Sequence, residues 1–142
     1  MTLTTEPRVG DDLPAFKVES VSADKIRIMA LIFQDPNPIH FDLEAVREAG
    51  LGDRYVNQGG VTMAYIINML TAWTGSRASI RSLSTRFTAN VFAGDAVEAG
   101  GTVTGVRNAD GRMLVDCDVW VRPVTADGGA PPVVSGTATV AL

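Results

Sequence analysis

The most informative part of this chain for predicting its fold is Gly59-Gly-Val-Thr-Met-Ala-Tyr-Ile-Ile-Asn-Met-Leu-Thr-Ala-Trp-Thr74. Its apolar side chains cover nearly every direction around a helix, and a helix that is apolar on all sides is a buried one. Gly75 indicates where this helix ends, so we predict a buried helix over about residues 59–75. The stretch is too short, and too often interrupted by polar residues, to span a bilayer. No membrane association is therefore predicted.

The residues after this helix alternate in the manner of β-strands. Apolar and polar side chains alternate in the ranges 82–91, 96–106, 113–122 and 133–142. Asn108-Ala-Asp-Gly111 is a hairpin-turn signal, and the Gly- and Pro-rich segment 125–132 is a further connection. Consecutive strands joined by short turns form an antiparallel sheet. One helix on such a sheet gives the α+β class, and a helix apolar on all sides needs further cover, which a dimer would supply.

The residues before the helix predict three shorter elements. The range 16–21 alternates like a strand, and Ser22 or Asp24 can cap a following helix whose apolar residues are Ile26, Met29, Ala30 and Phe33. That helix must end before Asp35-Pro-Asn-Pro38, because each proline excludes the residue before it from the helical region. Asp42 can cap a short helix over residues 43–49.

Composition narrows the possible partners. The 142 residues carry a net charge of −4 without a run of Lys or Arg, which disfavours nucleic acid and anionic membranes as partners. The only cysteine, Cys117, lies in an alternating strand and is predicted to be a buried reduced thiol. With one Cys and one His, a Cys/His zinc site within one subunit is disfavoured. The first residues lack the apolar core of a signal peptide, so a cytoplasmic location is expected.

The segment Asp35-Pro-Asn-Pro-Ile-His40 carries the candidate chemistry. Its two prolines make it a stiff loop, which can aim a carboxylate and an imidazole into one space without a large loss of conformational freedom. Such a pair suits acid–base catalysis near neutral pH, including addition of water to a carbon–carbon double bond. Asn37 is a candidate to orient a bound partner by hydrogen bonding. The same spacing also occurs by chance, so a purely structural role stays open at this point.

The second candidate feature is Gln58-Gly59-Gly60, at the start of the predicted buried helix. The first N–H groups of a helix lack partners within it, and the helix dipole makes that end electropositive. Glycines let a ligand approach the backbone closely. A thioester carbonyl that gains enolate charge needs such donors, although two glycines also serve as a simple helix start.

At these residues the chain resembles a known family. Asp35-Pro-Asn-Pro-Ile-His40 is similar to the hydratase-2 motif of MaoC-like proteins, Asp-x-Asn-Pro-(apolar)-His. The ranges Val9–Pro14, Leu83–Phe87 and Val91–Asp95 also resemble the family's N-terminal segment and the strand and turn after its central helix. The resemblance therefore spans most of the chain.

The resemblance implies one MaoC-like hot-dog domain over residues 1–142, in which a bent antiparallel sheet wraps a central helix. It implies reversible hydration of trans-2-enoyl thioesters of CoA or acyl-carrier protein to (R)-3-hydroxyacyl thioesters. Asp35 and His40 would be the acid–base pair, and Gly59 or Gly60 would supply the oxyanion N–H. No metal or redox cofactor is implied. The expected assembly is a homodimer, or a heterodimer with a related hot-dog subunit.

Two alternatives stay open. Many members have His-Gly where this chain has Gln58-Gly59, and the neighbourhood of Tyr55 is also similar to small subunits of steroid side-chain hydratases, so an acyl-binding partner subunit is one alternative. A hot-dog thioesterase is the other, disfavoured because residues 59–76 contain no Asp or Glu. The sequence leaves open the acyl chain length, the choice between CoA and carrier protein, and which of Asp35 and His40 moves which proton.

Overall fold

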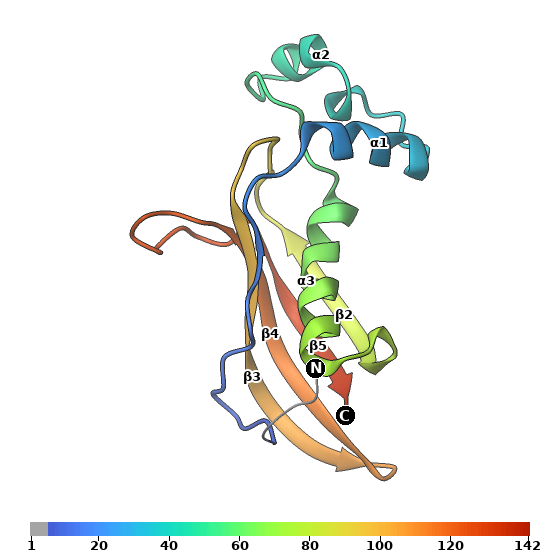
Figure 1. Cartoon of the computed structure of the whole chain (residues 1–142), viewed down its shortest axis with the longest axis vertical. Helices are drawn as coiled ribbons and strands as arrows, with labels where there is room; N and C mark the ends of the chain where they lie inside the picture. Colours follow the sequence, from blue (N-terminus) through green and yellow to red (C-terminus); the bar gives the residue numbers. More distant parts are fainter. Residues whose placement is uncertain (1–5) are drawn as a thin grey trace.

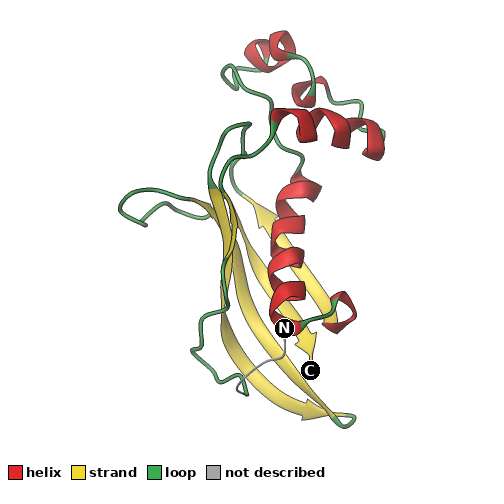
Figure 2. Ribbon diagram, in the orientation of Figure 1, coloured by secondary structure: helices red, strands yellow, loops and turns green. Residues whose placement is uncertain are grey.

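The computed structural model describes residues 6–142. They form a sheet, one long helix lying along it, and a smaller helical region beyond the N-terminal end of that helix (Figures 1 and 2). The helices are α1 (Ala23–Phe33), α2 (Leu43–Glu48) and α3 (Gly59–Thr74), with 3₁₀ turns η1 (Pro38–His40) and η2 (Arg77–Ser79). The strands are β1 (Phe16–Val18), β2 (Ile80–Phe87), β3 (Val97–Ala109), β4 (Arg112–Pro123) and β5 (Val134–Ala141).

The five strands form one antiparallel sheet in the order β1-β3-β4-β5-β2. The long strands curve, and α3 runs along the sheet (Figure 1). The predicted α+β class and hot-dog arrangement are confirmed. Strand β2 lies at one edge of the sheet, so one side of its backbone has no neighbouring strand within the described residues.

One face of the sheet packs against α3 and forms the core. Ile66, Met69 and Leu70 of α3 are at most 1% exposed. They belong to one cluster with alternate residues of three strands: Val97, Ala99 and Val103 of β3, Val115, Cys117, Val119 and Val121 of β4, and Val134, Ala138 and Val140 of β5. Period-two alternation places all of these side chains on one face. The prediction of a buried, unpaired Cys117 is confirmed.

Only one side of α3 is covered within a single chain. Thr62, Ile66, Met69 and Leu70 are buried, whereas Asn68 and Ala72 are exposed. Helix α3, whose sequence is apolar all round, therefore has an outer face that its own chain does not cover.

Among residues 6–142, no helix has the length and apolarity needed to cross a membrane.

The helical region beyond the start of α3 is built from α1, η1 and α2 (Figure 1). Ser22 caps α1 by accepting a hydrogen bond from Lys25 N, and Asp42 caps α2 by accepting from Glu44 N and Ala45 N. The caps predicted at Ser22 and Asp42 are confirmed, whereas Asp24 lies in the first turn of α1. Helix α1 ends at Phe33, and the following residue, Gln34, caps it in the left-handed conformation with φ 52°. Asp35-Pro36 follows, where the predicted break lies.

The structure differs from the prediction at two strand ends and in the loop before α2. Strand β2 ends at Phe87 instead of residue 91, because Val91 O accepts from Asn57 N and so pairs with the segment before α3. Strand β1 ends at Val18, since Val21 N bonds Asp95 O outside the sheet. Residues 38–40 form one 3₁₀ turn, where the two prolines excluded a regular helix; Pro38 is tolerated because it stands in the first turn.

Candidate active site

Asp35 is held by backbone groups on both sides. Its N–H donates to Ala30 O at 2.9 Å, which ties it to the last turn of α1. Its Oδ1 accepts from Asn37 N at 3.0 Å. The carboxylate is therefore oriented by the chain before and after it, and its side chain remains 31% exposed.

His40 is held from a distant part of the chain. Asn37 Oδ1 accepts from Ile39 N and starts the 3₁₀ turn that carries His40. The imidazole is 8% exposed, and its Nδ1 lies 2.6 Å from Val56 O. Because a carbonyl only accepts, Nδ1 carries a proton and donates it to Val56 O. Nε2 is thus the nitrogen left for chemistry.

The two side chains meet: His40 Nε2 lies 3.3 Å from Asp35 Oδ2. A carboxylate facing the free nitrogen of an imidazole can hold one proton between them and exchange it with a third group. The carboxylate is the more exposed member, so the pair is in contact with solvent on the side of Asp35.

Gly59 and Gly60 open α3, and both are exposed. Gln58, the N-cap residue, makes no side-chain hydrogen bond to the first turn, so that turn keeps its N–H donors without a side-chain cap. A Cβ atom on Gly59 would lie 3.4 Å from the Phe87 ring, and one on Gly60 would lie 3.8 Å from the Phe33 ring. Both are ordinary contacts, and neither glycine has a positive φ. The fold of the single chain therefore does not require glycine at either position.

A buried segment, Val56–Gln58, connects these features, and we call it the linking segment. Val56 O accepts from His40, and Val56 N donates to Ile39 O at 3.1 Å. Asn57 Nδ2 donates to Thr62 Oγ1 at 2.9 Å. Asn57 Nδ2 also donates to the hydroxyl of Tyr65 at 3.3 Å; burial raises the pKa of Tyr65, while this hydrogen bond acts in the opposite direction.

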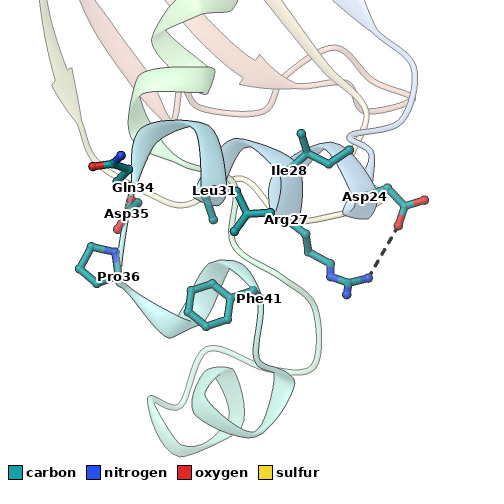
Figure 3. A pocket seen from close by; sticks show the side chains of 9 residues that line it. Asp24, Arg27, Ile28, Leu31, Gln34, Asp35, Pro36 and Phe41 are labelled. Carbon is teal, nitrogen blue, oxygen red and sulfur yellow. Dashed lines mark ion pairs between the residues drawn. The ribbon is translucent and has the colours of Figure 1, made fainter.

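Two cavities lie on the flanks of α1. One, of about 850 Å³, is lined by Asp35 and by apolar residues including Leu31 and Phe41 (Figure 3). The other, of about 390 Å³, is lined by Gly60 together with Phe33, Tyr65 and other residues of α1, α3 and β1. Asp35 thus lines the first of these two cavities, and Gly60 lines the second.

The structure brings some of the predicted site residues together. Asp35 and His40 are in contact, and Gly59 lies three residues after Val56, whose carbonyl fixes His40. Asn37 uses its side-chain oxygen to cap η1, and its predicted contact with substrate stays a prediction. Sequence reasoning did not find the role of Val56, whose carbonyl carries no residue-specific signal. It also missed the rings of Phe33 and Phe87 beside the two glycines.

Known structures share this architecture. The "(R)-hydratase from A. caviae involved in PHA biosynthesis" is similar with a TM-score of 0.79 and 21% identity, over 98% of this chain and 99% of that one. The ChsH1-ChsH2 complex from Mycobacterium tuberculosis gives a TM-score of 0.77 at 23% identity, over 96% and 99%. The HadBC (3R-hydroxyacyl-ACP dehydratase) complex from the same organism gives 0.69 at 20%, over 99% and 100%.

No curated protein sequence matches the chain. The family described as "MaoC like domain" matches residues 5–122, which include the paired Asp35 and His40, the linking segment and the start of α3. The chain therefore belongs to the MaoC-like domain family.

Proposed function

We propose that the chain catalyses the reversible hydration of trans-2-enoyl thioesters to (R)-3-hydroxyacyl thioesters. The observation that carries this proposal is the 3.3 Å approach of Asp35 Oδ2 to His40 Nε2, with His40 Nδ1 fixed by Val56 O. Membership of the MaoC-like family supports the same reaction class.

In the proposed reaction, one water is divided between two carbons. The oxygen of a water held at the Asp35–His40 pair bonds to C3 of the substrate, and the pair takes one proton from it. The pair delivers one proton to C2, where the enolate electron pair has developed. The pair thus begins and ends with the same number of protons, and the reverse sequence eliminates water. Such positioned proton transfer contributes roughly 10²–10⁴-fold to a rate.

The start of α3 would stabilise the enolate. As C3 gains the hydroxyl, negative charge moves to the thioester oxygen, and the N–H of Gly59 or Gly60 is available to donate to it. The positive end of the α3 dipole acts in the same direction. The proposed substrate is a CoA or acyl-carrier thioester, and the proposed reaction needs no metal or redox cofactor. A thioesterase is disfavoured because α3 offers no carboxylate.

The test is hydration of crotonyl-CoA, and then of longer enoyl-CoA substrates, followed by loss of the enoyl absorbance. Asp35→Asn and His40→Ala should each lower kcat by at least about 10²-fold. Asp53→Asn is the matched control, because Asp53 is an exposed carboxylate in the same region, paired with Arg47. Full activity in both pair variants would refute the proposed roles.

We further propose that a second copy or a related hot-dog subunit completes the site. Ile28, Leu31 and Ile32 of α1 are 53%, 79% and 64% exposed, and an apolar surface of this kind marks an interface. Two of the similar structures, ChsH1-ChsH2 and HadBC, are described as complexes. Leu31→Glu should shift sedimentation toward the monomer and lower activity, whereas Val9→Glu, at another exposed apolar residue, should do neither.

One observation favours a second candidate function, an acyl-binding partner subunit. Asp35 and Gly60 line different cavities in the single chain, so another subunit could supply part of the site. A folded chain that binds enoyl-CoA but hydrates none of these substrates alone would favour this role over independent catalysis.

A further inference from the structure

Asp35 and His40 are held by different parts of the chain. Asp35 is attached to the last turn of α1 through Ala30 O. His40 is attached to Val56 O. The 3.3 Å contact between Asp35 and His40 therefore depends on how α1 is fixed relative to Val56. We infer that Gln58 fixes it, as a positioning residue for the acid–base pair; this inference rests on the proposed function.

The contact that carries this role is a buried hydrogen bond. Gln58 is 2% exposed, and its Nε2 donates to Ile26 O, in the first half of α1, at 2.8 Å. Ile26 is itself 1% exposed, so both residues that form this bond are buried. The bond joins α1 to the residue immediately before Gly59. It links the element that carries Asp35 to the segment that carries both the acceptor of His40 and the glycine donors.

The orientation of the amide is fixed by its surroundings. If the amide were turned over, its oxygen would face Ile26 O, and two acceptors would oppose each other. In the orientation found, Gln58 Oε1 is buried and has no hydrogen-bond partner among residues 6–142. A buried carbonyl without a donor opposes folding. The side chain is thus kept at a cost to stability, and the one bond that it makes is the bond to α1.

Gln58 also lacks the hydrogen bond that is usual for a residue at the start of a helix. Gln58 is the N-cap of α3, where a side-chain oxygen usually accepts from the first turn. Here the side chain extends away to α1 and leaves the first turn uncapped. The same residue therefore frees the donors proposed for the thioester oxygen and holds the acid–base loop beside them.

The test compares variants that lose or keep the donor. Gln58→Met has a similar shape but removes both the Nε2 donor and the unpaired Oε1. It should lower kcat about 10- to 100-fold, the size of effect expected from small misplacement of catalytic groups, with KM changed less than about threefold. Its thermal midpoint should stay unchanged or rise. Gln58→His keeps a donor and should retain activity within about threefold of the wild type.

Thr74→Val is the matched control, because it removes a side-chain bond to Leu70 O, also of 2.8 Å, at the far end of α3. It should alter stability and leave kcat unchanged. If Gln58→Met lowered only the thermal midpoint and kept kcat, Gln58 would be structural and the inference would be wrong.

A second measurement does not depend on turnover. His40 is the only histidine, so its imidazole ¹⁵N signals are unambiguous. Gln58→Met should shift the Nε2 signal, as Asp35 moves away, whereas Thr74→Val should not. Unchanged signals in Gln58→Met would overturn the inference, even in a wild-type chain without hydratase activity. Absence of turnover in the wild type would instead count against the proposed function.

Discussion

Replacing Gly60 with alanine separates the needs of the fold from those of the site. The position is in the first turn of α3, has no positive φ, and would place a Cβ at an ordinary 3.8 Å from Phe33. Glycine in a helix is less stable than alanine by roughly 0.5–1 kcal/mol, because the unfolded glycine chain is more flexible. Gly60→Ala should therefore stabilise the chain by up to about that amount. For a chain of this size, that is a rise of roughly 1–4 °C in Tm.

Activity should move in the opposite direction. The new methyl group would stand beside the N–H proposed for the thioester oxygen, and loss of one oxyanion donor lowers kcat by about 10²–10³-fold. Since Gly60→Ala crowds the donor without removing it, we expect a loss of at least about tenfold in kcat/KM for crotonyl-CoA. Ala72→Gly, at an exposed residue of the same helix, is the reverse control and should lower Tm without affecting kcat/KM.

The two readouts refute different statements. A stabilised Gly60→Ala variant with full kcat/KM would show that the start of α3 does not contact the reacting thioester. A destabilised variant would show that the space beside Gly60 is already filled, for instance by a partner subunit. Gly59→Ala, whose Cβ would lie 3.4 Å from Phe87, should give the same activity loss with a smaller gain in stability.

Three further predictions concern the sheet and the caps. Burial raises the pKa of the Cys117 thiol to about 11, so a thiol reagent should react slowly with the folded chain at pH 8 and quickly in denaturant. The same pKa shift should lower the stability of the folded state as pH rises from about 9 to about 11. Fast labelling of the folded chain at pH 8 would contradict both expectations. Gly136→Ala would place a Cβ in steric overlap with Ser84 O and force β5 away from β2, so urea unfolding should show a loss of about 2 kcal/mol or more. Gly105→Ala, where the nearest atom is at 3.4 Å, should change the free energy of unfolding little. Ser22→Ala should lower the free energy of unfolding by about 1 kcal/mol through loss of the α1 cap, and an unchanged value would mean that the bond to Lys25 N contributes nothing.

Much of the fold could be predicted because its signals are local. The long apolar stretch predicted α3, the alternation around Cys117 predicted β4, and Asp42 was identified as a cap; all three are confirmed. These features depend on a residue and its near neighbours, through helical or strand periodicity and through short side-chain-to-backbone bonds. The end of β2 was wrong because residues 88–91 leave the sheet to meet the segment before α3, a long-range contact that alternation does not report.

The residues of the candidate chemistry can be identified without the structure. Two prolines between Asp35 and His40 make a stiff loop, and two glycines at the start of an apolar helix leave open donors. How these parts are held depends on the packing of distant segments: Val56 O fixes one nitrogen of His40, and Gln58 joins the start of α3 to α1. These bonds span 16 and 32 residues of chain. Both end on backbone carbonyls, which every residue possesses, so only the packing of the whole chain selects the ones that are used.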